Sequence, residues 1–432
     1  MTTSTEQTTA HTSAPTINGR PGDVGHGAAT HQQPAGHGSA PASHMGGGRA
    51  DRRDGHHGHA TAADVTRPQL AVVTLLTVLA LAVAVAIPAT RVNLGLSAED
   101  VGGLVMPPGM IMGPDTAADA MRDMAAVDPG AVTVAAPAAA RGDQPLPPRL
   151  ENGVKAFDLT VAATGWNILP DRRVDAYAVN GQVPGPRLRV TQGDRVRVTV
   201  HNQLPESTSI HWHGMILPNP MDGAAELTQP PIEPGQSFTY EFTAGQQGSY
   251  FYHSHAAPDR QQGLGLYGAL IVDPADPAVN AAYGYQHEAV VQLQEWLHRD
   301  GFTYPAMPME GALPNYFTIN GKAYPDTETI HMRVGERLRV RFIGTHNNFV
   351  HPMHIHGGPF RIVQTDGEPV PPAAQLLKDT VNVGPGERYD VIWEARQPGQ
   401  WLLHCHIPHH TTNDNAEQHG GGGLMAVITV AP

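Results

Sequence analysis

Residues 404–410 form the most informative stretch of the chain: His404-Cys405-His406-Ile407-Pro408-His409-His410. Cys405 is the only cysteine in the sequence, so it cannot form a disulfide within the chain. In a β-strand, successive side chains point to opposite faces. His404 and His406 would then face one side while Cys405 faces the other. This spacing predicts a thiolate site and an imidazole site joined by a few covalent bonds, a suitable path for single electrons.

Three more histidine clusters precede this stretch. They read His211-Trp212-His213-Gly214, His253-Ser254-His255 and His351-Pro352-Met353-His354-Ile355-His356-Gly357. Imidazole binds copper, zinc, iron and nickel, and a thiolate with two imidazoles is typical of blue-copper electron-transfer sites. The usual zinc patterns need several cysteines or a helical His-Glu-x-x-His, and the sequence has neither. The combined pattern therefore favours copper.

This set of clusters, in this order, resembles the multicopper oxidase family over roughly residues 150 to 432. The resemblance implies one type 1, one type 2 and two type 3 copper ions per chain. Their ligands would be His351, Cys405 and His410 for type 1; His211 and His354 for type 2; His213, His253 and His406 for one type 3 ion; and His255, His356 and His404 for the other. Electrons would enter at the type 1 ion, and dioxygen would be reduced to water at the trinuclear cluster of the other three.

Some histidines match none of these motifs and are expected to be structural or surface residues. They are His287, His298, His331, His346 and His419. His409 adjoins His410, but the family spacing from the cysteine selects His410 as the ligand.

The axial type 1 position is one departure from the family pattern. A polar insert, residues 411–419, and a run of glycines, Gly420 to Gly423, separate His410 from Leu424 and Met425. Matching the following strand to the family places Leu424 there, whereas a thioether is the usual weak axial ligand. We favour Met425, because the glycine run can shift the register.

A second departure concerns proton delivery. Many family members have an acidic residue directly after the last type 1 histidine, where this chain has Thr411. Asp222 matches the other acidic position of the family, which supplies protons for dioxygen reduction. The alternative for Asp222 is an ordinary turn residue before Gly223.

The copper-binding part is predicted to be all-β, with two similar halves. Short alternating runs broken by glycine and proline indicate β-sandwiches, and the resemblance makes them cupredoxin-like Greek-key domains. Residues 189–198 and 331–340 both read as strand, glycine turn and strand, and residues 248–253 parallel residues 399–404. We place domain 1 at residues 150–275 and domain 2, with the type 1 site, at residues 286–432.

With two such domains and type 1 ligands only in the second, the chain looks like the two-domain, small-laccase group. Members of that group build the trinuclear cluster between domain 1 of one chain and domain 2 of the next. A head-to-tail contact that closes makes a ring. The resemblance therefore implies a homotrimer with interfacial trinuclear sites. Copper nitrite reductase is also trimeric with two cupredoxin domains, but its type 1 cysteine lies in the first domain and it has no trinuclear cluster.

The N-terminal part differs in composition. Residues 1–66 are rich in Gly, Ala, Ser, Thr and His and are expected to be a disordered tail, either merely solvated or weakly metal-binding. The apolar run Leu70 to Ile87 predicts a membrane span within residues 67–90. Arginines before it place the N-terminus inside and the copper domains outside the membrane. Cleavage after Ala86 or Ala89 would instead release a secreted enzyme.

Residues 91–149 form a methionine-containing linker, with Met106, Met110, Met112, Met121 and Met124. Thioethers favour Cu(I), so the linker is either a copper-handling arm or a tether that packs against the assembly. We favour the tether.

The predicted function is a laccase-like oxidase that couples one-electron oxidation of phenols, aromatic amines or similar donors to four-electron reduction of dioxygen. The first alternative is a metallo-oxidase acting on Cu(I), Mn(II) or Fe(II). A net charge of −13 and the residues Asp414 and Glu417 in the insert favour cationic donors. A copper store without turnover is a further alternative. Acids outnumber Lys and Arg, and there is no basic patch, so nucleic-acid binding is not expected.

Overall fold

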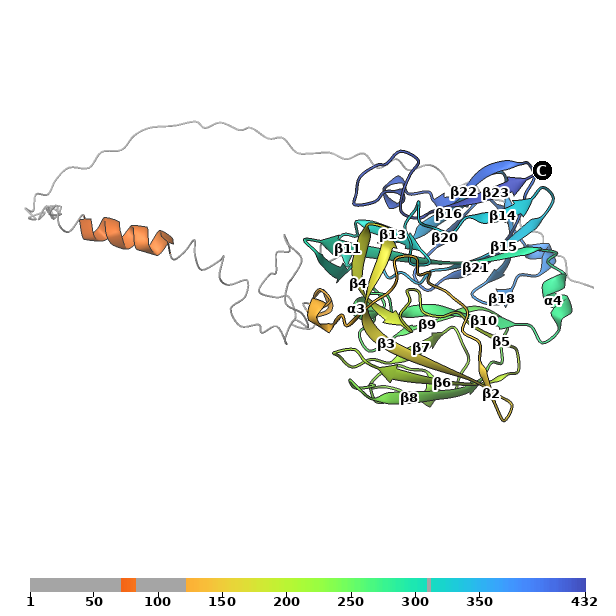
Figure 1. Ribbon diagram of the computed structural model, residues 1–432, viewed down its shortest axis with the longest axis horizontal. Helices are drawn as coiled ribbons and strands as arrows, with labels where there is room; N and C mark the ends of the chain where they lie inside the picture. The colour runs from red at the N-terminus through yellow and green to blue at the C-terminus, as the bar shows by residue number, and fades with distance from the viewer. Residues whose placement is uncertain (1–70, 83–121, 309–311) are drawn as a thin grey trace, which may run out of the picture. The chain divides into compact units, whose positions relative to one another are not determined.

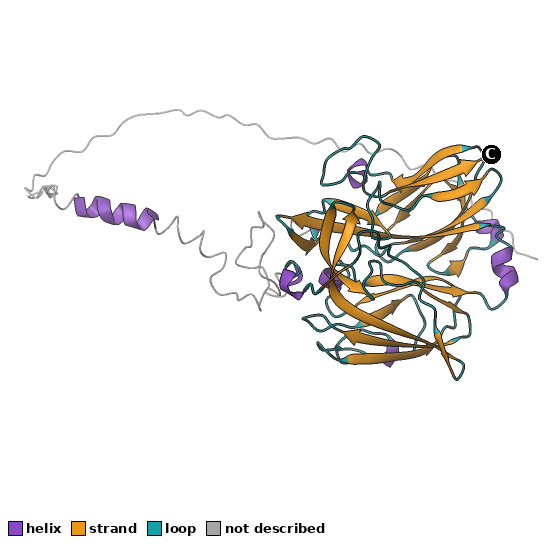
Figure 2. Cartoon of the chain, in the orientation of Figure 1, coloured by secondary structure: helices purple, strands orange, loops and turns teal. Residues whose placement is uncertain are grey.

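The computed structural model describes residues 71–82, 122–308 and 312–432 (Figure 1). Strands dominate these residues (Figure 2), which confirms the prediction of an all-β protein. The predicted tail, residues 1–66, and the linker residues 91–121 lie outside the described ranges. Within the predicted span at residues 67–90, only residues 71–82 are described, and they are helical. In the described ranges, no helix combines the length and the apolar character that crossing a membrane requires.

The first sandwich consists of two sheets. The strands of its outer sheet are β1 (Val134–Ala135), β2 (Arg149–Glu151), β3 (Val154–Leu169), β4 (Arg172–Val179), β6 (Arg195–Asn202) and β8 (Ser237–Thr243). Its inner sheet contains β5 (Leu188–Thr191), β7 (Ile210–His213), β9 (Gly248–Ser254) and β10 (Tyr267–Asp273). The outer sheet is ordered β1-β3-β6-β8, with β2 and β4 also paired to β3, and the inner sheet is ordered β5-β10-β9-β7.

The second sandwich also has an inner and an outer sheet. Its inner sheet contains β11 (His287–Arg299), β12 (Phe302–Pro305), β13 (Tyr316–Ile319), β15 (Arg337–Ile343), β17 (Phe360–Thr365), β18 (Glu368–Pro369), β19 (Leu377–Lys378) and β21 (Arg388–Glu394). Its outer sheet is ordered β14-β23-β22-β16-β20. These strands are β14 (Ile330–Arg333), β16 (His351–Ile355), β20 (Thr380–Val383), β22 (Gly399–Cys405) and β23 (Met425–Ala431).

Within residues 122–308 and 312–432, the helices named here are short and lie in connections. They are the α-helices α3 (Pro258–Gln261) and α4 (Pro277–Ala281), and the 3-10 turns η1 (Pro129–Ala131), η2 (Asn219–Met221), η4 (Pro372–Ala374) and η5 (Pro408–Thr411). Asp276 caps the N-terminus of α4 by accepting a hydrogen bond from the backbone N–H of Ala278. This helix follows directly after the first sandwich in the chain.

The two sandwiches repeat one pattern of strand pairing. In the first, β3 runs parallel to β6 and β5 runs parallel to β10. In the second, β11 runs parallel to β15 and β14 runs parallel to β23. The antiparallel pair β7–β9, which carries histidines, corresponds to the pair β16–β22. The histidine clusters therefore occupy equivalent strands in both halves.

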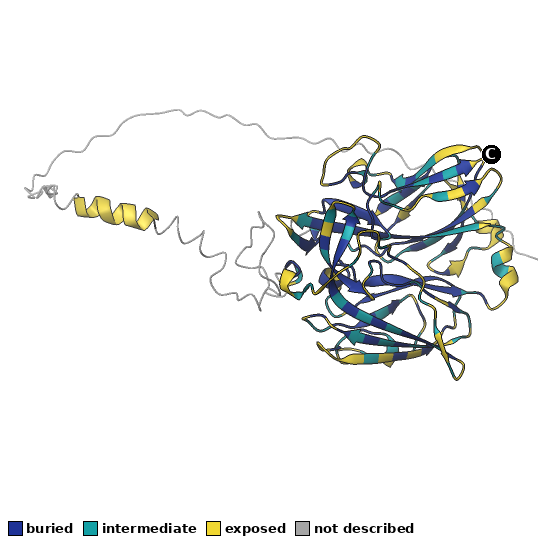
Figure 3. Ribbon diagram, viewed as in Figure 1, coloured by how far each residue is buried: buried dark blue, intermediate teal, exposed yellow. Residues whose placement is uncertain are grey.

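The sheets stack in four layers, because the inner sheet of the first sandwich is buried on both faces. Every residue of β9 is buried (Figure 3). Tyr250 and Tyr252 point into the core of the first sandwich, while Phe251 packs with Val290 and Ile343 of the second. A strand buried on both faces reads as a continuous apolar run, as Tyr250-Phe251-Tyr252 does.

A buried ionic network joins the inner sheets of the two sandwiches. Asp390 on β21 accepts hydrogen bonds from Arg341 (2.8 Å) and Arg339 (2.5 Å) of β15, and from the hydroxyl of Ser249 on β9 (2.7 Å). Arg341 also donates to Ser249 Oγ at 2.9 Å and to Glu288 at 2.9 Å. All of these groups except Glu288 are almost completely buried. The two arginine charges are thus compensated inside the interface.

Residues 122–148, predicted as linker, run along both sandwiches. The guanidinium of Arg260 donates to the carbonyl of Ala126 at 3.2 Å, and the N–H of Val127 donates to the carbonyl of Thr303 at 2.9 Å. Met124 is buried with Leu297, Tyr304 and Met307. Met124 thus packs in an apolar cluster, whereas Met106, Met110, Met112 and Met121 lie outside the described residues.

We expect Asp390→Asn to destabilise the protein by about 3–5 kcal/mol, since it leaves two buried arginines without their shared carboxylate. Urea or guanidinium unfolding measures this change. Glu394→Gln on the same strand is the control, because Glu394 forms only an exposed ion pair with Arg337 at 3.4 Å and should lose less than about 1 kcal/mol. Equal losses in both variants would contradict a central role for the network.

Candidate metal centre

Cys405 lies in the core of the second sandwich, at the end of β22, with two histidines beside it. Its Sγ is 3.7 Å from Nδ1 of His351 and 3.6 Å from Nδ1 of His410. The two Nδ1 atoms are 3.0 Å apart. His351 begins β16, and His410 lies in the turn η5 that follows the cysteine. One thiol and two imidazole nitrogens thus converge on one point.

Burial controls the protonation of this group. It raises the pKa of the Cys405 thiol to about 12 and lowers the pKa of His351 to about 3 and of His410 to about 4. Without a metal, the thiol is protonated and the imidazoles are neutral at pH 7. Neutral imidazole is the form that binds metals, and a coordinating thiol is deprotonated by the metal itself. Two imidazoles and one thiolate are the donor set of a blue-copper site, so the residues fit copper.

The register of β22 and β23 shows whether Leu424 or Met425 lies on the same face as Cys405. His404 pairs with Met425, and the N–H of Cys405 donates to the carbonyl of Leu424 at 3.0 Å. Opposite residues in an antiparallel pair share a face. Leu424 therefore lies on the face of Cys405 and in the same core cluster, while Met425 lies on the face of His404. The register therefore favours Leu424 over Met425, the residue preferred from the sequence, because the glycine run does not shift the strand.

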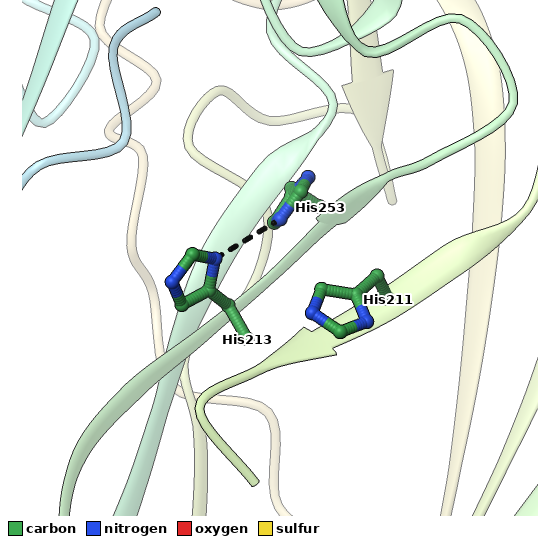
Figure 4. A group of neighbouring side chains, drawn as sticks. All are labelled: His211, His213 and His253. Carbon is green, nitrogen blue, oxygen red and sulfur yellow. Dashed lines mark hydrogen bonds between the residues drawn. The ribbon is translucent and has the colours of Figure 1, made fainter. Parts of the chain in front are cut away.

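The first group of histidines lies on β7 and β9 (Figure 4). His211 pairs directly with His253 across the two strands, and Nδ1 of His213 is 3.4 Å from Nε2 of His253. The ring of His211 is 5.4 Å from the ring of His255, which is exposed at the end of β9. Desolvation lowers the pKa of His213 to about 4 and holds the pKa of His253 well below its ordinary value. His213 and His253 are thus neutral at pH 7, and all four imidazoles lie close together as possible metal ligands.

The second group lies on the equivalent strands, β16 and β22. His354 pairs with His404, and Nε2 of His356 is 3.0 Å from Nε2 of His404. His406, just beyond β22, has its ring 5.6 Å from that of His354. His354, His356 and Asp379 line an open pocket of about 400 Å³. The histidines on either side of Cys405 therefore lie on the outer face of this sheet.

In both groups, a backbone carbonyl orients one histidine. Nδ1 of His211 lies 2.7 Å from the backbone carbonyl of Asp222, and Nδ1 of His354 lies 2.7 Å from the carbonyl of Asp379. A carbonyl accepts only, so each Nδ1 carries the proton and each Nε2 is free for a metal. The sequence did not identify Asp379, because its role depends on a backbone atom.

The two groups do not combine within one chain. In the described ranges, each close set of possible metal ligands draws its imidazoles from only one of the sandwiches. His255 and His406 are exposed. The chain thus presents two half-sites at separate surfaces.

Asp222 and Thr411 occupy the two positions at which many family members have an acidic residue. The Asp222 carboxylate is 3.6 Å from Nδ1 of His211, and its side chain is partly exposed. The Thr411 hydroxyl donates to the carbonyl of Pro408 at 2.8 Å. Among the histidines without a motif, His346 is fully buried and forms a fourth close set with Glu295 and His351. Glu295 was missed, although an acid inside the buried apolar run of β11 is an unusual signal.

Two models described as multicopper oxidase match the chain, over residues 160–277 and 302–430. The chain belongs to the multicopper oxidase family. Family membership implies that it binds copper.

Individual multicopper oxidases and related proteins are similar to this chain. Copper resistance protein A of Escherichia coli is 32% identical over 287 residues, covering 56% of this chain and 46% of that protein. Laccase-1 of Cryptococcus neoformans var. grubii is 32% identical over 268 residues, covering 55% of this chain and 40% of that protein. The blue copper oxidase of Nitrosomonas europaea is 36% identical with a TM-score of 0.59, covering 64% of this chain and 85% of that chain. The chain spans less than half the length of these two curated relatives.

Lowering the pH from 7 to 5 should destabilise the copper-free protein. His213, His351 and His410 have an ordinary pKa of 6.5, lowered by burial to about 4, 3 and 4. Between these values the unfolded chain binds more protons than the folded chain. Stability is therefore complete above the ordinary pKa and falls with pH below it, by up to ~1.4 kcal/mol per pH unit for each group.

Urea midpoints at pH 7, 6 and 5 measure this dependence. Copper-loaded protein is the control, because ligation opposes protonation of the same imidazoles. A midpoint that stays constant or rises toward pH 5 in copper-free protein would contradict it.

Proposed function

We propose that the protein is a laccase-like oxidase that couples one-electron oxidation of a reducing donor to the reduction of dioxygen to water. The observation that carries this proposal is the position of Cys405 between two sites. Its thiol points into the core toward His351 and His410, while the adjacent His404 and His406 lie on the outer face beside His354. One strand therefore links a buried thiolate site to an exposed imidazole site.

The proposed ligand sets follow the geometry and the family pattern. The type 1 copper would be held by His351, Cys405 and His410, with Leu424 in the axial position as a side chain that does not coordinate. The type 2 copper would be held by His211 and His354, and the two type 3 coppers by His213, His253 and His406 and by His255, His356 and His404. Copper, when bound, supplies one-electron oxidation and reduction and the reaction with dioxygen, at four ions per chain.

The chain's own residues would hold the ligands and move protons. Reduction of one dioxygen to two water molecules takes four electrons and four protons. Asp222 is in contact with His211 and partly exposed, so its carboxylate can take protons from solvent and pass them toward the cluster. The carbonyls of Asp222 and Asp379 keep the metal-binding Nε2 atoms of His211 and His354 unprotonated.

The half-sites support a homotrimer in which each trinuclear cluster lies between two chains. Large apolar side chains are exposed near both half-sites: Ile216 and Leu227 follow the first group, and Leu376 and Leu377 precede Asp379. Such exposed apolar residues are typical of protein interfaces. A head-to-tail ring would bury them and bring the two sets of histidines together.

Phenols and aromatic amines are the first proposed donors, and electrons would enter near His410. This ring stacks on Phe317 with a centroid distance of 4.3 Å. Metal ions such as Cu(I), Mn(II) or Fe(II) are the second, because Asp414 and Glu417 are exposed in the loop after His410. The similarity to both a laccase and a copper resistance protein is compatible with either class. Comparing the steady-state oxidation rates of a phenol and of Cu(I) under dioxygen distinguishes the two donor classes.

The proposed location is outside the cytoplasmic membrane, with the protein either anchored or released.

Copper content and the absorption spectrum test the function directly. Four coppers per chain and a strong band near ~600 nm are expected for a blue-copper centre with a trinuclear cluster. Dioxygen uptake should follow donor oxidation. Two coppers per chain, with turnover of nitrite in place of dioxygen, would instead indicate an enzyme like nitrite reductase, and copper without turnover would indicate a copper store.

Cys405→Ser should abolish the ~600 nm band and lower the oxidase rate by several orders of magnitude, because the thiolate and the electron path are removed together. Absorption and dioxygen uptake measure the two effects. The control is Thr411→Ser, which keeps the hydroxyl beside the turn and should retain both. Substantial turnover by Cys405→Ser would refute the proposed path.

A complementation experiment tests the shared cluster. His213→Ala and His356→Ala damage opposite half-sites, so each variant alone should be inactive. Each mixed ring contains one interface in three where an intact domain 1 meets an intact domain 2, so mixed trimers should regain about a third of the wild-type activity. Co-expression with two affinity tags measures this activity. No recovery in verified mixed trimers, or a monomeric active enzyme by light scattering, would rule out interfacial sites.

A further inference from the structure

Behind His351, on the side away from Cys405, lies a cluster that the proposed copper ligands do not use. It consists of Glu295 on β11 and His346 in the loop before β16, together with His351 itself. The three residues are between 0% and 1% exposed. A carboxylate at such depth is costly unless it is paired and hydrogen-bonded.

The contacts of Glu295 account for both of its oxygens. Oε1 is 3.0 Å from the backbone N–H of Phe349, which donates to it, and 3.2 Å from Nε2 of His351. Oε2 accepts a hydrogen bond from the side-chain amide of Asn348 at 2.8 Å. In the described part of the chain, His351 is the only basic side chain that lies within ion-pair distance of Glu295.

His346 does not offset the negative charge of the Glu295 carboxylate. Its ring lies edge-on to that of His351, 4.3 Å away, and neither of its nitrogens makes a hydrogen bond. A separate metal ion in this cluster is also disfavoured, because amide donors already occupy both carboxylate oxygens. The carboxylate instead faces the far side of a type 1 ligand.

The two nitrogens of His351 have different surroundings. Nδ1 faces the Cys405 sulfur, and Nε2 faces Glu295. When Nδ1 binds a metal, the proton of the neutral ring must be on Nε2, next to the carboxylate. In the metal-free chain this contact is not yet a well-aligned hydrogen bond. Metal binding at Nδ1 would both fix the tautomer and place a positive charge near the carboxylate.

We propose that Glu295 is a positioning residue for His351, which orients the imidazole, stabilises the oxidised type 1 copper relative to the reduced one, and couples copper binding to folding. The inference rests on the proposed function, since it requires a type 1 copper. A negative charge hydrogen-bonded to a ligand makes that ligand a stronger donor and favours the metal in its higher charge state. The potential of the type 1 copper is therefore lower than it would be without the carboxylate.

Glu295→Gln tests this proposal, with Glu394→Gln as the control for loss of a negative charge at an exposed site in the same sandwich. The reduction potential is measured by redox titration of the ~600 nm band. Thermal unfolding is measured with and without copper. The proposal predicts a higher potential in Glu295→Gln, a smaller stabilisation by copper, and a copper-free protein at least as stable as the wild type. Glu394→Gln should match the wild type in all three.

The outcomes separate the possible roles. An unchanged potential with unchanged copper stabilisation would overturn the proposal, as would a copper-free Glu295→Gln protein clearly less stable than the wild type, which indicates a purely structural role. If Glu295→Gln folds without copper but takes up no type 1 copper, the coupling between Glu295 and copper binding is supported. Absence of the ~600 nm band in the wild type would reject the proposed function itself.

Discussion

The alternation of side chains along one strand, His404-Cys405-His406, is the constraint on which the rest of the site depends. A strand at the edge of a core has one dry face and one exposed face. Cys405 takes the dry face, where burial keeps the unliganded thiol protonated, and the two histidines take the other. In the proposed function, electrons passing between these faces would cross only the backbone of adjacent residues. This arrangement requires that β22 has the core of the sandwich on one face and an open surface on the other.

Duplication of the sandwich explains the division of the imidazole site. The pairs β7–β9 and β16–β22 are equivalent strands, and in each the two strands present histidines on one face. In each half a backbone carbonyl, from Asp222 or Asp379, orients the first histidine of the pair. In the proposed function, each sandwich would supply half of the ligands, and a complete cluster would need a contact between sandwiches of different chains.

Within the chain, the two sandwiches meet through other faces. Phe251 and Ile271 on one side pack against Val290 and Ile343 on the other, and the Arg339–Arg341–Asp390 network lies in the same interface. Buried ion pairs add little net stability but are costly to disrupt.

The sequence by itself determined the all-β class, the repeated halves and the grouping of histidines, because strand periodicity and His-x-His spacing are local properties. The resemblance to the multicopper oxidases also indicated that His410, not His409, joins Cys405, because the family spacing from the cysteine selects it. Leu424 could not be separated from Met425, because a one-residue shift in register exchanges the faces of a strand.

The roles of Glu295 and Asp379 could not be predicted from the sequence for a related reason. Glu295 contacts His351 from a strand distant in sequence. Asp379 acts through its backbone carbonyl, so its residue type gives no signal in the sequence. Only the tertiary structure decided these contacts, because they depend on which strands pack together and not on spacing along the chain.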